Sequence, residues 1–565
     1  MLRTLSTALA LVCPLAAADL ILHNGRIVTA DARFTIAEAI SIEKGRIVRV
    51  GSNAAVLKDR TASTQVVDLK GRMVLPGLID AHVHALGAGL SEFKRKLPPL
   101  NSIADIQTFI RDRARTTPAG EWIVVPRTLP PRLKEQRFPT KTDLDVVTTH
   151  PVAFDGSYVW GANTMALKLS GITRDTPNPP GGEVVKGPDG EPNGILRNAA
   201  KLLKGVPRET AYSDQEKAEA LETMLKIYAA AGLTGIGDRA VTEEDVAVYR
   251  QLHAAKRLPV RSVLTWRIDA SRDVEAVVRE IRERPWTTNQ GDDWLKFGSF
   301  KVTLDGGQSV GTAYQRMPYG EYGRHLYGQT DPDARGTLFV EPKKLTAIFG
   351  AARAKGWQLT SHVQGGAAID ILLDVFEALD KEKPIRETRS HVMHGSFMSA
   401  EAVDRMKRMG VIADVQAGWL HLDVPALEKV FGYRTMRYFF PLQSYVKAGI
   451  VMAGGSDHMI GHDKDKAVNP FNPFFNMWMA ITRRTTEGKV IYPEEKINRE
   501  QALRMYTNGA AYLQFNEKKA GSLEPGKYAD LVMIDRDFLT CPEEDIRAIQ
   551  PLATMVEGKL RYGKW

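Results

Sequence analysis

The chain has 565 residues, of which 43% are hydrophobic, and its 76 Lys and Arg against 67 Asp and Glu give a formal net charge of +9. This length is far above what one small core needs and predicts more than one domain. The charge excess is modest for the length and forms no Lys/Arg block with interleaved aromatic residues. The composition therefore argues against a nucleic-acid partner and leaves a small-molecule substrate as the expected one.

Residues 1–18 have the composition of a secretory signal peptide. Arg3 is their only charged residue, residues 5–15 are largely apolar, and the alanines at 16–18 fit a cleavage site. The apolar run is too short to serve as a stable membrane anchor. We therefore expect a periplasmic or secreted protein; the alternative is an ordinary buried N-terminal segment.

The sequence contains two cysteines, and one of them, Cys13, lies in the predicted signal peptide. The mature chain then keeps only Cys541 and forms no internal disulfide, although its expected compartment permits them. Any metal site must be built from histidine, carboxylate and lysine side chains.

Both ends of the mature chain are rich in short β-strand patterns. In residues 19–75 and 519–565, β-branched and apolar runs are broken by turn dipeptides such as Asn24-Gly25. We expect these two segments to pair into one composite β-domain, a small β-sandwich that flanks the rest of the chain.

The middle of the chain, residues 76–518, alternates strand and helix patterns. After a first strand before residue 84, strand-like runs occupy residues 233–238, 260–268, 295–304, 357–362, 391–394, 411–416 and 450–454. Helical patterns occupy residues 214–231, 243–256, 273–284, 342–355 and 369–380. Eight β/α units of this kind predict an α/β fold, specifically a (β/α)8 TIM barrel.

One stretch does not fit a simple barrel. Residues 85–208 are too many for a βα loop, and they are rich in proline and glycine with a few apolar runs. We interpret them as an inserted subdomain after the first strand, covering the C-terminal face of the barrel, where active sites of this fold lie.

The first strand ends in His82-Val-His84. Residues i and i+2 of a strand point to the same face, so this run presents two imidazoles side by side. Adjacent imidazoles are what a metal ion needs from two neighbouring ligands. A lone His-x-His is often a surface accident, but here it follows a Pro-Gly turn and an apolar strand.

Four further candidates lie at or near the ends of later strands, where a barrel places its catalytic groups. Lys301 is on the fourth strand, His362 ends the fifth, His394 ends the sixth and Asp457 ends the eighth. The ordered set is a much stronger signal than any one member, and it predicts a metal centre.

These residue types suit hydrolytic metal chemistry. Imidazole and carboxylate groups bind zinc or a related divalent ion at neutral pH. A lysine ammonium has no lone pair, so Lys301 ligates only if its free amine adds carbon dioxide to become a carbamate. One or two ions held in this way would activate a water molecule. Asp457 would take the proton of that water and pass it to the leaving group.

Each candidate has a structural alternative. Lys301 can instead pair with Asp305 as a partly buried salt bridge, and Asp457 can cap the following helix. His394 can be an ordinary core or capping histidine. His391 lies three residues earlier on the same strand and faces the opposite way, so we expect only His394 to ligate.

A second group of residues is expected at the substrate pocket. For the histidines a satisfied or exposed side chain is the alternative, and for the tryptophan it is core packing. The group comprises Asp305, His421, His458 and Trp419.

Four motifs resemble the amidohydrolase superfamily, specifically its YtcJ-like branch, amidohydrolase family 3. They are the first-strand run Pro76-Gly-Leu-Ile-Asp-Ala-His-Val-His84, the element Lys301-Val-Thr-Leu-Asp-Gly306, and residues 171–182 and 521–532. The resemblance covers nearly the whole mature chain. It implies a composite β-domain, a barrel, often a homodimer, and hydrolysis of an amide-like bond. It also implies metal ligation by His82, His84, Lys301, His362, His394 and Asp457, with Asp457 as proton shuttle.

The sequence departs from that family pattern at three places. Met393 stands where an acid usually precedes the sixth-strand histidine, Gln364-Gly-Gly replaces a Gly-Asp-Arg run, and His458-Met-Ile follows Asp457. These departures concern the substrate pocket more than the metal site.

We therefore expect a metal-dependent hydrolase that cleaves a C–N bond, such as that of an N-acyl or N-formyl amine or a cyclic amide. The runner-up is a deaminase or an ester or lactone hydrolase, because the same activated water attacks those centres. A non-catalytic metal-binding protein is the least favoured alternative, because every ligand position is filled.

Overall fold

The computed structural model describes residues 18–207 and 212–565. All but the last residue of the predicted signal peptide, including Cys13, lies outside the described residues. Within those ranges, no helix combines the length and the apolar composition needed to cross a membrane.

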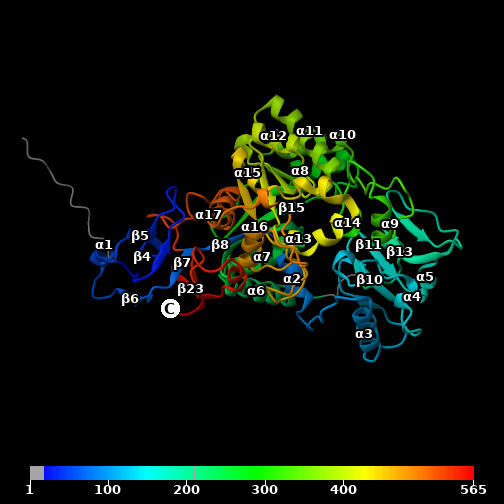
Figure 1. The fold of residues 1–565 in the computed structure, drawn as a ribbon, viewed down its shortest axis with the longest axis horizontal. Coiled ribbons are helices and arrows are strands. Elements are labelled where there is room, and N and C mark those ends of the chain that lie inside the picture. Colours follow the sequence, from blue (N-terminus) through cyan, green and yellow to red (C-terminus); the bar gives the residue numbers. More distant parts are fainter. Residues whose placement is uncertain (1–17, 208–211) are drawn as a thin grey trace, which may run out of the picture.

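The centre of the protein is a nearly closed barrel of eight parallel strands (Figure 1). Seven parallel ladders join neighbouring strands in chain order. The first and last strands meet through a single parallel bridge between Val83 and His458. The predicted barrel is therefore confirmed. Its strands are β8 (Leu78–Val83), β14 (Leu233–Val241), β15 (Arg261–Arg267), β16 (Leu295–Thr303), β17 (Gln358–Val363), β18 (His391–His394), β19 (Ile412–Val415) and β20 (Met452–Gly454).

Helices cover the outside of the barrel; α6, α7, α8, α10 and α11 lie where the sequence pattern predicts helices, and α12 is not among the predicted ones. They begin where capping residues occur: Ser213 and Glu216 form a reciprocal capping box at the start of α6, and Thr242 and Asp245 do so for α7. The strands beneath them are almost wholly buried, as expected of a parallel sheet covered on both faces. The principal barrel helices are α6 (Asp214–Ala230), α7 (Glu243–Ala254), α8 (Val274–Glu283), α10 (Pro342–Ala354), α11 (Gly366–Glu382) and α12 (Ala400–Met409).

The two ends of the chain lie together beside the barrel (Figure 1). One sheet has the order β23-β22-β21-β7-β2-β3, and β7 (Met73–Pro76) from the N-terminal part pairs antiparallel with β21 (Leu531–Ile534) from the C-terminal part. A second sheet, β5-β4-β1-β6, comes from the N-terminal part alone. Apolar residues of both sheets share one buried cluster. The other strands are β1 (Leu20–His23), β2 (Arg26–Val28), β3 (Ile36–Ala37), β4 (Ala39–Glu43), β5 (Arg46–Gly51), β6 (Gln65–Asp68), β22 (Pro551–Val556) and β23 (Lys559–Gly563).

The long stretch after β8 folds around a mixed five-stranded sheet with the order β12-β13-β11-β10-β9. In Figure 1 its strands and helix α3 (Ile103–Ala114) lie at the opposite end of the molecule from the sheets of the chain termini. The strands are β9 (Ile123–Val125), β10 (Val152–Gly156), β11 (Val159–Ala162), β12 (Glu183–Lys186) and β13 (Pro192–Arg197).

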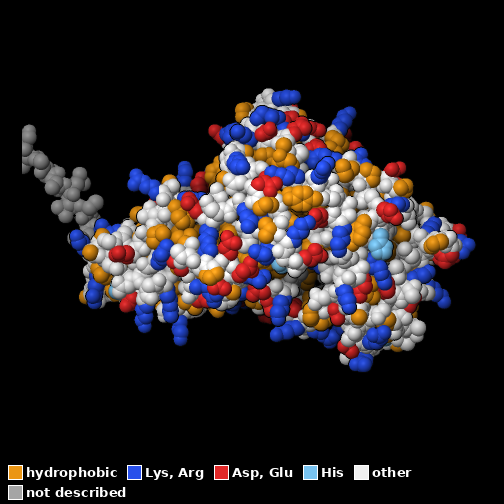
Figure 2. All heavy atoms as spheres, viewed as in Figure 1, with side chains coloured by type: hydrophobic (Ala, Val, Ile, Leu, Met, Phe, Trp, Pro, Cys, Tyr) orange, Lys and Arg blue, Asp and Glu red, His pale blue; other side chains and the backbone are white. Residues whose placement is uncertain are grey.

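Acidic and basic side chains are intermixed over the face seen in Figure 2, as the modest net charge leads us to expect. That view shows no broad patch of a single sign.

Candidate metal centre

The end of β8 is fixed to the end of β20 by a buried carboxylate. Asp80 Oδ1 accepts hydrogen bonds from the backbone N–H groups of His82 and Ser456, both at 3.0 Å. The N–H of Asp457 in turn donates to the backbone oxygen of His82 at 2.8 Å. These bonds hold the first-strand histidines and the eighth-strand aspartate in one fixed arrangement.

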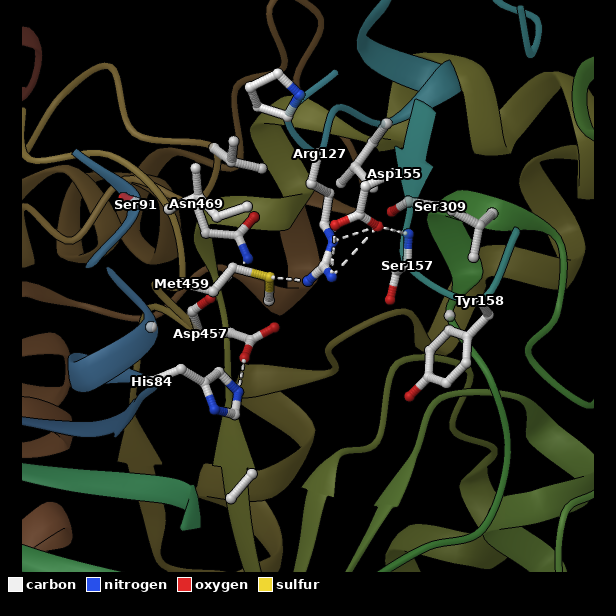
Figure 3. A pocket seen from close by; sticks show the side chains of 18 of the residues that line it. His84, Ser91, Arg127, Asp155, Ser157, Tyr158, Ser309, Asp457, Met459 and Asn469 are labelled. Carbon is white, nitrogen blue, oxygen red and sulfur yellow. Dashed lines mark hydrogen bonds and ion pairs between the residues drawn. The ribbon is translucent and has the colours of Figure 1, made fainter. Parts of the chain in front are cut away.

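His82, His84 and Asp457 converge on one point. Nε2 of each histidine lies 3.1 Å from Asp457 Oδ1, and the candidate ligand atoms of the three residues all lie within 4.8 Å of one another. Figure 3 shows the imidazole of His84 directed at the Asp457 carboxylate. The structure thus brings together three of the residues that the sequence predicts to bind metal.

The backbone of Asp457 is unusual in a way that aims its side chain. Its φ of 55° lies in the left-handed region, which non-glycine residues rarely adopt. The Asn469 side-chain amide donates to the Asp457 backbone oxygen at 2.7 Å and helps to hold this conformation. Burial alone would raise the pKa of the Asp457 carboxyl. The nearby imidazoles of His82 and His84 outweigh burial and hold that pKa well below its usual range.

His362 and His394 form a second pair of ring nitrogens. His394 Nε2 lies 3.0 Å from His362 Nδ1. His362 Nε2 lies 3.2 Å from the backbone oxygen of Gly306, which only accepts, so the proton of that ring belongs on Nε2. His394 Nδ1 lies 2.7 Å from Gln416 Oε1, which also only accepts, so its proton belongs on Nδ1. Two lone pairs therefore face each other with no proton between them.

This arrangement fits a cation. Two ligand nitrogens that each lie about 2.0–2.1 Å from a zinc ion are roughly 3 Å apart, which is the separation of the His362–His394 pair. Burial lowers the pKa of His84 to about 4 and that of His362 to about 3, so both imidazoles keep a free lone pair near neutral pH. His82 Nε2 is buried and, within the described part of the chain, has no hydrogen-bond partner despite its nearness to Asp457. The donor set is that of a divalent metal ion.

Lys301 lines the same cavity from β16 and is almost wholly buried. Burial lowers the pKa of its amine to about 8. Among the described residues it makes no ion pair with Asp305, because the oxygens of Asp305 accept from the backbone N–H groups of Tyr314, Gln364 and Gly365. The alternative of a Lys301–Asp305 salt bridge is therefore wrong.

A cavity of about 640 Å³ opens over the metal centre. The barrel contributes the candidate ligands His84, Lys301, His362, His394 and Asp457 to its lining, together with Trp419, whose ring stacks on that of His394. The inserted stretch contributes further lining residues, including Arg127, Asp155 and Tyr158. The inserted sheet and the C-terminal edge of the barrel thus share one pocket.

Three of the four residues expected at the substrate pocket do not line this cavity, and each has another role. His458 Nδ1 lies 2.7 Å from the Tyr228 hydroxyl and its Nε2 lies 2.8 Å from the Gly461 oxygen, so both of its nitrogens are satisfied. His421 Nδ1 lies 2.7 Å from the Arg484 oxygen. Asp305 holds backbone N–H groups as described above. Only Trp419 lies in the pocket.

The sequence interpretation missed a charged pair in the inserted sheet. Arg127 Nη2 lies 3.1 Å from Asp155 Oδ2, and Arg127 Nη1 lies 3.2 Å from Met459 Sδ (Figure 3). The available signal was weak: Arg127 follows the apolar run Ile123-Val-Val, and Asp155 ends a similar run. Two of the three places where the sequence departs from the family pattern contribute residues to the cavity lining, namely Gln364 and Met459.

Comparison with known proteins agrees with this geometry. The profile of the amidohydrolase family matches residues 65–562. An N-substituted formamide deformylase of Arthrobacter pascens is 30% identical over 96% of this chain and 98% of its own. The putative amidohydrolase YtcJ of Bacillus subtilis is 26% identical over 96% of this chain and 99% of its own.

Among solved structures, an uncharacterized metal-dependent hydrolase from Pyrococcus horikoshii superimposes with a TM-score of 0.68. The alignment covers 93% of this chain and 99% of that one at 21% identity. An atrazine chlorohydrolase from Arthrobacter aurescens, TrzN, complexed with zinc, gives a TM-score of 0.53 at 15% identity, over 96% and 94% of the two chains. At these identities the likeness concerns the fold.

Proposed function

Because this chain belongs to the amidohydrolase family, we propose that it is a metal-dependent hydrolase that cleaves the C–N bond of an N-formyl or N-acyl amine or a cyclic amide. The observation that carries the proposal is the convergence of His82, His84 and Asp457 at the end of the barrel, beneath a cavity. Similarity over nearly the full length to an N-substituted formamide deformylase supports an N-formyl amine as the first substrate to test.

The residues of the site divide into two groups of ligands. His82, His84 and Asp457 would hold one ion, and His362 and His394 would hold a second. Lys301 lies in the same cavity, and its lowered pKa favours the neutral amine that adds carbon dioxide, so it would join the ligands as a carbamate. We take zinc as the ion because the donors are imidazole and carboxylate groups. A divalent ion bound there would acidify water and polarise the substrate carbonyl.

The protein itself supplies proton transfer through Asp457. In the described part of the chain, its carboxylate lies close to His82 Nε2 and His84 Nε2, in both cases through Oδ1. The carboxylate takes the proton of the attacking water and delivers it to the leaving nitrogen, so that an amine departs instead of a strongly basic amide anion. The left-handed backbone at Asp457 and its hydrogen bonds to His82 and Asn469 keep the carboxylate at the reacting centre.

The cavity suits a small organic substrate. Its volume of about 640 Å³ lies within the usual range of small-molecule sites, roughly 300–1,000 Å³. The apolar surface of Trp419 and the phenol of Tyr158 lie on its wall, with the Arg127–Asp155 pair on the side of the inserted sheet. A hydrophobic amine substituent would contact the aromatic wall while its acyl group faces the metal centre.

A panel of substrates tests the proposal. The zinc-loaded protein is incubated with N-formyl and N-acetyl amines, cyclic amides, aminopurines, esters and lactones, and the released acid, amine, ammonia and alcohol are quantified separately. We expect release of amine and acid, and we expect Asp457→Asn to lower kcat by at least about 100-fold with the fold retained. His253→Gln is the matched control, since this histidine lies at the surface and faces Asp292. Release of ammonia or alcohol alone would replace the proposed reaction by deamination or ester hydrolysis.

A further inference from the structure

Two polar side chains that the proposed metal chemistry does not use lie at the end of β19: Asp414 is on the strand and Gln416 directly follows it. Asp414 and Gln416 are both fully buried. Gln416 Nε2 lies 2.8 Å from Asp414 Oδ1, and Gln416 Oε1 lies 2.7 Å from His394 Nδ1. The three residues form a continuous chain of hydrogen bonds, which we call the relay.

A buried arginine anchors the far end of the relay. Arg239 Nε lies 3.4 Å from Asp414 Oδ2 and donates to the backbone oxygen of Ala81 at 2.6 Å. Its Nη1 donates to Thr265 Oγ1 and Ser299 Oγ, both at 3.1 Å. The guanidinium therefore has a fixed place inside the barrel and offsets the charge of the buried carboxylate.

The chemistry of these groups allows the hydrogen bonds of the relay to run in only one direction, from His394 as donor to Asp414 as final acceptor. An ionised carboxylate accepts hydrogen bonds and never donates, so Gln416 must turn its NH2 group toward Asp414. Its carbonyl oxygen then faces His394 and accepts the proton of Nδ1. His394 is thereby held with a bare Nε2, and that is the atom 3.0 Å from His362 Nδ1.

Without the relay, the metal-free protein would favour the other tautomer of His394, with the proton on Nε2. A proton on Nε2 would make a hydrogen bond to the lone pair of His362 Nδ1, because His362 is protonated on Nε2 by its contact with Gly306. That histidine–histidine bond would occupy both lone pairs that a metal ion needs. The relay excludes it by keeping the proton on the other side of the ring.

We propose that Asp414 and Gln416 are positioning residues that set the tautomer of His394 and keep the His362–His394 pair open to a metal ion. The inference rests on the proposed metal-dependent function. It gives a role to the end of the seventh strand, where we place no metal ligand. The relay also reaches the first-strand ligands at longer range, since His82 Nδ1 lies 3.4 Å from both Asp414 Oδ2 and Gln416 Nε2.

Metal binding, measured without reference to turnover, tests the proposal. The full chain is stripped with a chelator and titrated with Co²⁺, whose visible absorption reports ligand geometry, and with Zn²⁺ followed by metal analysis. Gln416→Met keeps the side-chain volume and removes the acceptor for His394. Asp414→Asn removes the constraint on direction, because an asparagine both donates and accepts.

For each variant we expect metal affinity at the His362–His394 pair to fall by about 10- to 100-fold, with an altered cobalt spectrum. Thr360→Val is the matched control. Thr360 is equally buried on β17, two strands away from β19, and its hydroxyl donates to the backbone oxygen of His391 at 3.0 Å. This control variant should bind cobalt as the wild type does, and the melting temperature of each metal-free protein separates lost affinity from lost stability.

The outcomes are distinguishable. If Gln416→Met or Asp414→Asn folds and binds cobalt with wild-type affinity and spectrum, the relay proposal is overturned while the hydrolase remains. If neither variant folds and Thr360→Val does, the two residues are purely structural and the proposal is again overturned. If the wild-type protein itself binds no divalent ion, it is the proposed function that fails.

Discussion

Gly455 shows how little room the metal centre has at the level of single residues. A Cβ atom built on Gly455 would lie 2.6 Å from His82 Cβ and 2.8 Å from the His82 backbone nitrogen. Contacts this short with backbone atoms force the neighbour to move. The absence of a side chain at this position is therefore a condition for placing His82.

We expect Gly455→Ala to displace His82, lower metal affinity at least about tenfold and destabilise the protein by about 1–3 kcal/mol. Gly350→Ala is the contrasting variant. Its added Cβ meets no atom within 4 Å, and it lies inside α10, where alanine stabilises a helix by up to about 1 kcal/mol relative to glycine. Thermal unfolding and zinc titration of both variants check this. If Gly455→Ala bound zinc with wild-type affinity, the close packing of Gly455 against His82 would not be needed to place that ligand.

Among structural elements, the inserted sheet contributes charged side chains to the cavity in addition to the metal ligands of the barrel. Strands β9 and β10 bring Arg127 and Asp155 to the cavity that the barrel strands line from the other side. Arg127 also lies 3.2 Å from Met459 Sδ, which belongs to the segment after Asp457. The insertion therefore forms the side of the cavity that carries the Arg127–Asp155 pair.

We expect Arg127→Met to raise KM for the best substrate of the panel about tenfold, a loss of about 1.4 kcal/mol of binding, while kcat changes by less than about twofold. Contacts remote from the reacting atoms contribute equally to the ground state and the transition state. Arg174→Met is the control, because that arginine lies in the same insertion but pairs with Glu191 at the surface. Steady-state kinetics of the three proteins decide. A fall in kcat at constant KM would instead place Arg127 at the chemical step.

The sequence alone predicts the elements of this fold better than it predicts the pocket. The strands from residue 233 onward and the histidines at their ends follow from local apolar patterns, and local patterns determine which residues end a parallel strand. The partners of a buried polar group depend on residues far away in sequence. The sequence leaves open whether His458 contacts substrate or is satisfied within the protein, and the structure shows that Tyr228 and Gly461 satisfy its ring. Asp414 and Gln416 looked like ordinary strand residues, because their role depends on His394 and on Arg239.

At the scale of the whole molecule, the barrel and the C-terminal segment are joined by a buried ion pair. Arg261 on β15 contacts both oxygens of Asp530, with Nε–Oδ2 at 2.7 Å and Nη2–Oδ1 at 3.2 Å. The guanidinium also lies 3.8 Å from the centre of the Tyr528 ring. Asp530 immediately precedes β21, so this contact ties the sheet of the chain termini to the barrel wall.

We expect Asp530→Asn to lower the free energy of unfolding by about 3–5 kcal/mol, because it leaves the buried Arg261 guanidinium without its carboxylate partner. Asp535→Asn is the matched control. It removes an ion pair with the adjacent Arg536 at the surface, and such pairs contribute about 0–1 kcal/mol. Denaturant unfolding of both variants measures the difference. Equal stability of the two variants would show that the domains do not depend on this contact.

The ligands His82, His84 and Asp457 lie where the first and last strands of the barrel meet, and this position has a mechanical consequence. Strands β8 and β20 are the two margins of the eight-stranded sheet; one parallel bridge between Val83 and His458 and the hydrogen bonds of Asp80 and His82 join them in place of a full ladder. His82 and His84 belong to one margin and Asp457 follows the other. An ion bound by all three would therefore cross-link the two margins. Metal binding would then also stabilise the closed form of the barrel.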